Sequence, residues 1–262
     1  MKTKLLLPNA LIIITLASVL VISACKQKNQ KEEAVMAAQV FSTEPMSSSP
    51  EYSDAGIQSM DYRDGKFNFS ISGSSYALGV QTSDAPAKTC ANSDKGQHIH
   101  LIIDDKPYEA KYEPQFSYKV ADGSHYVMAF LSRSYHESIK SPKAHVLVKA
   151  EIKDSGFVKV EPVTAPMLFY SRPKGIYIGK DAQNVMLDFY LSNCNLGNQY
   201  KVKAEVAGNS FVLDEWKPVL MKGLPMGEHT MKLSLVDSAG NLVNTPLNPV
   251  ERKFTLQEEP AK

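Results

Sequence analysis

Hydrophobic and polar residues alternate along both halves of the chain's body with the two-residue period of half-buried β-strands. Met231, Leu233 and Leu235 alternate with polar side chains, and the stretch 201–206 follows the same rule. Turn-forming residues separate these stretches, and the body carries no apolar stripe of a long helix. The pattern predicts an all-β fold of short strands joined by tight turns.

The body also contains an internal repeat. A shift of 104 residues places Gly123 on Gly227 and His125 on His229, and much of the alternation pattern agrees at the same shift. The further identities pair Pro114, Leu131, Pro142, Val146 and Lys149 with Pro218, Leu235, Pro246, Val250 and Lys253. The upstream strands match only if the first copy carries an insertion at roughly 82–96. A duplicated unit of about 90 residues is the economical interpretation.

Strand length, turn spacing and unit size together favour two tandem β-sandwiches of immunoglobulin type. We predict the first sandwich at residues 62–160 and the second at 161–257, followed by a tail at 258–262. The Cys-Trp-Cys spacing of antibody domains is missing, so the prediction concerns the architecture only.

The chain begins with the three parts of a bacterial export signal. Lys2 and Lys4 precede the apolar stretch Leu11–Ile22, which is too short to cross roughly 30 Å of hydrocarbon as a helix. The stretch leads into the sequence Ile-Ser-Ala-Cys, which resembles the lipobox of bacterial lipoproteins. The resemblance implies that residues 1–24 are a signal peptide and that Cys25 carries the lipid that holds the protein to a membrane.

The residues that follow Cys25 indicate where the anchored protein resides. Lys26 rather than Asp comes next, so the retention signal of some inner-membrane lipoproteins is absent. This favours the outer membrane, on its periplasmic face or at the cell surface. The stretch 25–61 is rich in Ser, Glu, Gln, Ala and Pro without an apolar period, and we interpret it as a flexible tether.

Charge and cysteine content narrow the range of partners. With 29 basic and 28 acidic residues, the chain has no bulk charge with which to bind nucleic acid or a polyanionic surface. Besides Cys25, the chain has two cysteines, Cys90 and Cys194. An oxidising compartment permits a disulfide between them, and the sequence leaves open whether it forms.

His98 and His100 are candidate metal ligands. Side chains at positions i and i+2 of a strand project from the same face about 7 Å apart, so these imidazoles can share a copper or zinc ion with a further ligand. The candidates for that ligand are His125, His136, Asp104 and Asp105. Alternatively, the repeat aligns the pair with Val202 and Ala204, which we interpret as inward-facing. The histidines would then line the core and bond backbone carbonyl groups.

The stretch 132–140 is a candidate binding loop, because the second copy replaces it with a plain turn. The basic residues of this loop, and of a second loop near the junction of the two units, are Arg133, His136, Lys140, Arg172 and Lys174. Such residues can cradle a phosphate or carboxylate, with Arg133 in bidentate contact. The alternative is a solvated loop in which Glu137 forms salt bridges.

Sequence motifs of catalysis are missing from the chain. It has no Gly-x-Ser-x-Gly elbow, no phosphate-binding Gly-rich loop and no His-Glu-x-x-His motif. We therefore expect a non-enzymatic protein without an obligatory cofactor.

Three stretches, 96–104, 130–140 and 224–229, resemble a family of uncharacterised Gram-negative lipoproteins with tandem immunoglobulin-like domains, whose members are sometimes labelled phosphopeptide-binding. We predict a lipid-anchored binding protein of the cell envelope that recognises an anionic peptide or another envelope component. One alternative is a copper- or zinc-binding protein that uses His98 and His100. The other is an architectural envelope protein.

Overall fold

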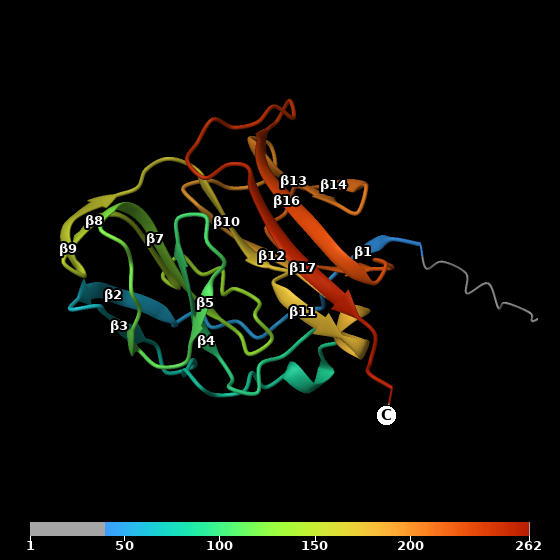
Figure 1. Ribbon diagram of the computed structural model, residues 1–262, viewed down its shortest axis with the longest axis horizontal. Coiled ribbons are helices and arrows are strands. Elements are labelled where there is room, and N and C mark those ends of the chain that lie inside the picture. The colour runs from blue at the N-terminus through green and yellow to red at the C-terminus, as the bar shows by residue number, and fades with distance from the viewer. Residues whose placement is uncertain (1–39, 262) are drawn as a thin grey trace, which may run out of the picture. The chain divides into compact units, whose positions relative to one another are not determined.

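The computed structural model describes residues 40–261 of the chain. The predicted signal peptide, Cys25 and the first part of the predicted tether lie outside this range. The described residues form seventeen β-strands and two short 3-10 helices, η1 (Ala85–Ala87) and η2 (Gly179–Ala182) (Figure 1). No helix among the described residues has the length and apolar character needed to cross a membrane.

The first sandwich consists of two sheets, with the strand orders β2-β3-β6 and β5-β4-β7-β8-β9. Alternate residues of these strands, among them Phe67, Leu101 and Val127, fill a core between the sheets. The strands are β2 (Gly56–Arg63), β3 (Lys66–Ser72), β4 (His98–Ile103), β5 (Glu109–Lys111), β6 (Gln115–Ser117), β7 (Gly123–Ser132), β8 (His145–Lys153) and β9 (Gly156–Pro162).

The second sandwich has the strand orders β1-β15-β12-β10 and β11-β17-β16-β13-β14. Its core contains Leu187, Val202 and Leu233 from facing sheets. The strands are β1 (Ser42–Pro45), β10 (Met167–Arg172), β11 (Gly175–Ile178), β12 (Val185–Ser192), β13 (Tyr200–Val206), β14 (Asn209–Leu213), β15 (Val219–Lys222), β16 (Gly227–Asp237) and β17 (Val250–Gln257).

Both sandwiches have immunoglobulin-type topology. In the second, β10, β12 and β15 occupy the positions of strands A, B and E, and β13, β16 and β17 occupy those of C, F and G. β11 adds to the second sheet in parallel with β17. In the first sandwich, β2, β3 and β6 face β4, β7 and β8 in the same order. The predicted all-β fold with two tandem immunoglobulin-like sandwiches is confirmed.

The strand boundaries follow the repeat. β6 and β15 begin 104 residues apart, as do β7 and β16. The paired glycines at the start of the latter two strands, Gly123 and Gly227, have φ angles of 129° and 121°, which favour glycine. Two residues later, Nε2 of His125 donates to Ala121 O at 3.0 Å and Nε2 of His229 donates to Pro225 O at 2.7 Å. These equivalent histidines each close a loop.

The repeat slips by one residue at β4, which changes the interpretation of the two histidines there. β4 pairs with β7 so that Ile99 lies opposite Leu131, whereas β13 pairs with β16 so that Val202 lies opposite Leu235. Because the two leucines are equivalent, Val202 corresponds to Ile99. A slip of one residue moves every side chain of a strand to the other face. His98 and His100 therefore lie outside the core of the first sandwich, and the alternative interpretation, in which they line this core, is wrong.

The predicted tether is too long at its C-terminal end. Residues 42–45 form β1, which pairs antiparallel with β15 of the second sandwich, and β2 of the first sandwich begins at Gly56. All four residues of β1 are exposed. The strand is held by backbone hydrogen bonds at a sheet edge, so it carries no apolar alternation that the sequence could reveal.

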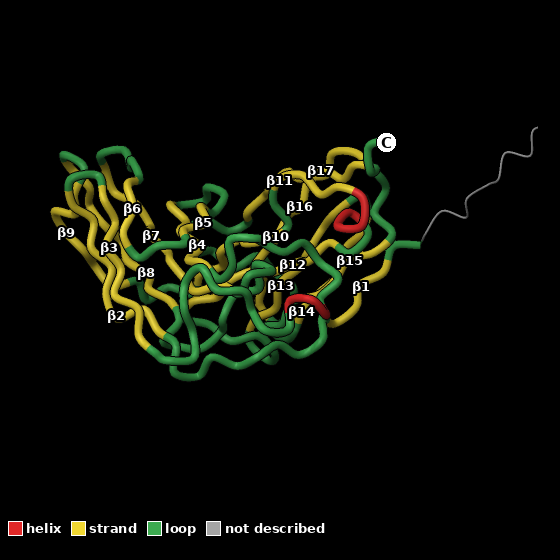
Figure 2. The backbone as a smooth tube through the Cα atoms, turned by 90° about the horizontal axis from the view of Figure 1, so that it is seen from below, coloured by secondary structure: helices red, strands yellow, loops and turns green. Residues whose placement is uncertain are grey.

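A third apolar cluster joins the two sandwiches. It contains Ile102 of β4 and Phe130 of β7 from the first sandwich, together with Met167 of β10 and Tyr190 of β12 from the second. Figure 2 shows β4 and β10 toward the middle of the molecule. The outer face of β4 therefore lies against the second sandwich. This contact, rather than the core of the first sandwich, is what buries His98 and His100.

Cys90 and Cys194 are free thiols, so the disulfide that the sequence left open is not formed. Cys90 packs against Tyr135 and Met186, whereas Cys194 packs at the edge of the second core. Burial raises the pKa of each thiol to about 11, so both are protonated and poorly nucleophilic at neutral pH.

Candidate metal centre

Three imidazoles converge at the junction between the sandwiches. His98 and His100 extend from the outer face of β4, and His136 extends from the turn that follows β7. Nε2 of His98 lies 2.9 Å from Nε2 of His100 and 2.9 Å from Nδ1 of His136. The three nitrogen atoms all lie within 4.8 Å of one another, which is close enough for small movements to bring them around one ion.

The loop before β4 orients His98. Nδ1 of His98 lies 2.8 Å from the carbonyl oxygen of Gly96, which can only accept a hydrogen bond. The proton is therefore on Nδ1, and the lone pair of Nε2 points at the other two histidines. A side chain at Gly96 would come within 2.6 Å of the Gly79 backbone, and its φ of 84° also favours glycine. A second partner that fixes the tautomer in this way is typical of metal-binding histidines.

A tight turn brings His136 into the cluster. The His136 N–H donates to Arg133 O, and the Arg133 N–H donates to Glu137 O, both at 2.9 Å. His136 has a φ of 68°, in the left-handed region that non-glycine residues rarely adopt. Strained backbone of this kind is concentrated at functional sites, where the surrounding structure maintains it.

The second sandwich contributes to the position of His100. Nδ1 of His100 lies 3.2 Å from Oγ of Ser171 in β10, which can accept its proton and leave Nε2 free. The other contact is with Tyr108, whose ring stacks on the His100 ring with centroids 3.6 Å apart and planes 8° apart. The Tyr108 hydroxyl also lies 3.3 Å from Nδ1 of His136.

Burial keeps the three imidazoles neutral. His98 and His100 are fully buried and His136 is half-buried. Burial lowers the pKa of His98 to about 4. It also lowers the pKa of His100 and of His136 well below 6.5, and the positive charges of Arg172 and Lys174 act in the same direction. Neutral imidazoles have the lone pairs that metal ions require.

The three imidazoles cannot all form good hydrogen bonds with one another. Two neutral imidazole nitrogens 2.9 Å apart need one proton between them, and Nε2 of His98 has one lone pair for two such neighbours. One of the two contacts is therefore poorly satisfied in a buried site, which is costly. A cation at the centre accepts all three lone pairs. With bonds of about 2.0–2.1 Å, its ligands would be roughly 3.3 Å apart, so small movements suffice.

The five basic residues expected to cradle an anion are divided between two places. His136, Arg172 and Lys174 lie at the histidine cluster, whereas Arg133 and Lys140 line a separate cavity of about 590 Å³. Arg172 is buried, and its guanidinium donates to the Tyr177 hydroxyl at 2.9 Å. The five residues therefore do not form the single anion-binding cradle predicted from the sequence.

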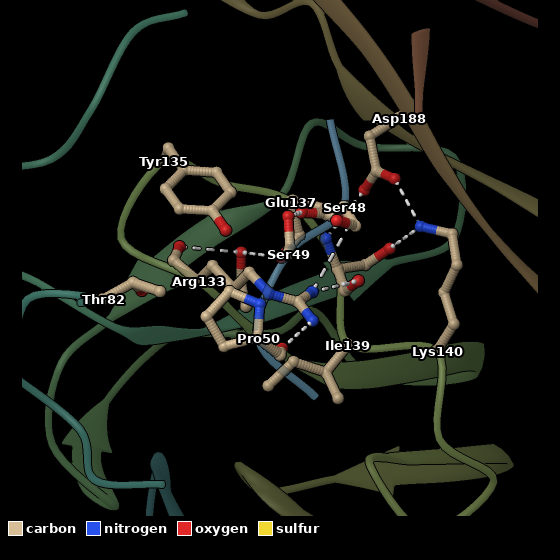
Figure 3. A network of polar contacts seen from close by, with 12 residues as sticks. Ser48, Ser49, Pro50, Thr82, Arg133, Tyr135, Glu137, Ile139, Lys140 and Asp188 are labelled. Atoms are coloured by element: carbon tan, nitrogen blue, oxygen red, sulfur yellow. Dashed lines mark hydrogen bonds and ion pairs between the residues drawn. The ribbon is translucent and has the colours of Figure 1, made fainter. Parts of the chain in front are cut away.

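Arg133 and Lys140 are also already occupied (Figure 3). The two terminal nitrogens of Arg133 donate to Ser138 O and Pro50 O, and Glu137 lies 3.5 Å away. Lys140 forms a 2.7 Å ion pair with Asp188, a buried residue of β12. Arg133 is therefore not free to form the expected bidentate contact with an external anion. The alternative of a salt-bridged loop describes these residues better, although the loop is buried rather than solvated.

Sequence reasoning missed three residues around these sites, Tyr108, Ser171 and Asp188. Tyr108 and Ser171 belong to segments whose approach to β4 depends on the tertiary fold, and no local pattern marks them. Asp188 did carry a signal, because it is the one charged residue within the apolar stretch Val185–Leu191. A carboxylate buried in such a strand needs a cationic partner.

Comparisons with known proteins identify no relative by sequence: no protein-family model matches the chain, and no curated protein is significantly similar to it. Among solved structures, the fibronectin(III)-like modules of Clostridium thermocellum CbhA are 11% identical, with a TM-score of 0.28, over 84% of this chain and 95% of that one. A Ca2+-stabilized adhesin from an Antarctic bacterium, which helps it bind ice, is 12% identical, with a TM-score of 0.22, over 86% of this chain and 50% of that one.

Proposed function

We propose that the protein binds a copper or zinc ion through His98, His100 and His136, as a non-enzymatic lipoprotein of the cell envelope. An immunoglobulin-like fold is compatible with a binding role of this kind. The observation that carries the proposal is the position of His98 Nε2, which has a single lone pair 2.9 Å from nitrogen atoms of both other histidines. A metal ion uses all three lone pairs at once.

Thermal unfolding of the purified protein with and without Zn²⁺ or copper tests this function. A ligand that binds only the folded state, at about a hundredfold over its Kd, stabilises it by about 2.7 kcal/mol. For a chain of this size, we expect Tm to rise by roughly 5–10 °C. Elemental analysis of the dialysed protein should find about one ion per chain.

The His98→Ala, His100→Ala double variant is expected to lose this shift, because it retains one ligand. His125→Ala is the matched control, since His125 is bonded to Asp104 and Ala121 rather than to the cluster. An equal rise in Tm for the double variant, or no rise in the natural protein, would rule out the proposed site.

Anchoring in the envelope is the second part of the proposal, and it rests on the sequence around Cys25. Lipid on this cysteine would make attachment effectively permanent, because each buried methylene contributes about 0.8 kcal/mol. We expect the protein to sediment with membranes and to incorporate labelled palmitate, and the Cys25→Ser variant to do neither. A variant that still carries label would show that the lipid is elsewhere.

A further inference from the structure

We propose that the three-histidine site is selective for monovalent copper, Cu(I), and that Lys174 and Arg172 of the second sandwich set this selectivity. The inference rests on the proposed function, because it names the ion that the same three ligands hold. Three features support it: the charge of the ligand set, the cations beside it and the number of ligands.

The converging ligands bring no negative charge to the ion. Among the described residues, the group around His98 consists of three imidazoles, without a carboxylate or thiolate. His98 and His100 are fully buried, so water screens the ion poorly. An uncompensated charge in such a place is costly, and the cost rises steeply with the charge. The ligand set therefore favours a monovalent ion over a divalent one.

Two fixed positive charges lie beside the ligands. Nζ of Lys174 lies 4.3 Å from the centroid of the Tyr108 ring and bonds the Tyr108 carbonyl oxygen, and Cζ of Arg172 lies 5.8 Å from the same ring. That ring stacks directly on His100. The repulsion between a fixed charge and a bound ion is proportional to the charge of the ion. A divalent ion therefore meets twice the repulsion that Cu(I) meets.

A carboxylate near this region is already neutralised by another partner. The charge of Asp188 reaches Tyr108, but Asp188 forms its 2.7 Å ion pair with Lys140 and accepts the Ser138 N–H at 3.0 Å. It is thus not available to offset the charge of Arg172, and the carboxylate that acts on Lys174 is that of Glu109, which favours the charged form of the amine.

The number of ligands favours the same ion. Zinc sites are almost always completed by a fourth ligand, whereas three nitrogen atoms satisfy Cu(I). The stacked Tyr108 ring covers His100, and the Tyr108 hydroxyl lies 3.3 Å from Nδ1 of His136. Tyr108 therefore occupies space that a fourth ligand would need. A three-coordinate ion therefore fits the enclosure formed by these side chains.

Competition against chromogenic chelators measures the two affinities, with Cu(I) kept reduced by ascorbate without oxygen and with Zn(II) measured separately. We expect a Kd for Cu(I) at least tenfold lower than that for Zn(II). Lys174→Gln removes one positive charge, so it should tighten the binding of both ions. The change in log Kd should be about twice as large for Zn(II) as for Cu(I), because the repulsion scales with the charge of the ion.

Two variants separate charge from local damage. Lys174→Arg keeps the charge and should keep the selectivity, whereas Lys253→Gln removes an exposed lysine of β17 and should change neither affinity. Tighter binding of Zn(II) than of Cu(I), or an equal effect of Lys174→Gln on both ions, would overturn the selectivity and leave the metal site standing. Binding of neither ion to the natural protein would overturn the proposed function itself.

Discussion

Replacing Phe130 with alanine will lower the free energy of unfolding by about 3–5 kcal/mol, the usual cost of removing a buried phenylalanine. Phe130 is fully buried in the cluster that joins the two sandwiches, and its ring stacks on Tyr190 at 4.6 Å. The cavity left behind lies between two rigid sheets that cannot close over it. Urea unfolding followed by circular dichroism measures the loss, and we expect Tm to fall by roughly 10 °C.

The matched control is Phe130→Leu, which keeps most of the volume and should cost less than about 1.5 kcal/mol. We also expect Phe130→Ala to weaken metal binding, since the Phe130 ring centroid lies 5.0 Å from that of His100. If Phe130→Ala cost less than about 1 kcal/mol, the cluster would not hold the sandwiches together.

Replacing Lys140 with methionine will lower the free energy of unfolding by about 3 kcal/mol, although the side chain is partly exposed. The change leaves the carboxylate of Asp188 in β12 buried without its cation, and breaking a buried pair at one partner typically costs 3–5 kcal/mol. The natural pair crosses the junction, because Lys140 belongs to the first sandwich and Asp188 to the second. Urea unfolding of the variant at neutral pH measures the effect.

A double-mutant cycle separates the uncompensated charge from the lost packing. Asp188→Asn in the Lys140→Met background removes the charge but keeps an acceptor for the Ser138 N–H. We expect the double variant to recover more than half of the lost stability. Equal losses in the single and double variants would mean that Lys140 contributes through its packing rather than through the ion pair.

The sequence was sufficient to predict the fold because the patterns that indicate strands are local. Strand alternation such as Met231, Leu233 and Leu235 reflects which face of a sheet is buried, and the repeat reflects a duplicated topology. β1 escaped prediction for the opposite reason. Its four exposed residues pair with an edge strand about 180 residues away, and hydrogen bonding through the backbone leaves no trace in side-chain type.

Only part of the candidate site could be predicted by the same reasoning. The spacing of His98 and His100 correctly placed both on one face, and His136 was among the candidate third ligands. The repeat then suggested the wrong face, since a gapless shift cannot register the one-residue slip that pairs Ile99 with Leu131. Ser171 could not be foreseen, because it reaches His100 only when the second sandwich lies against β4.

The path of the chain through β1 limits how the two sandwiches can move. The described part of the chain lies first in the second sandwich, at β1, crosses to the first through residues 46–55, and returns through residues 163–166. Two units joined by a single linker can rotate about it, whereas two separate crossings restrict that rotation. Any opening is limited by both crossings at once, and the shorter one, residues 163–166, sets how far the sandwiches can move apart. The contact of Ser171 with His100 spans the junction, so any opening would remove the partner that the second sandwich supplies to orient this ligand.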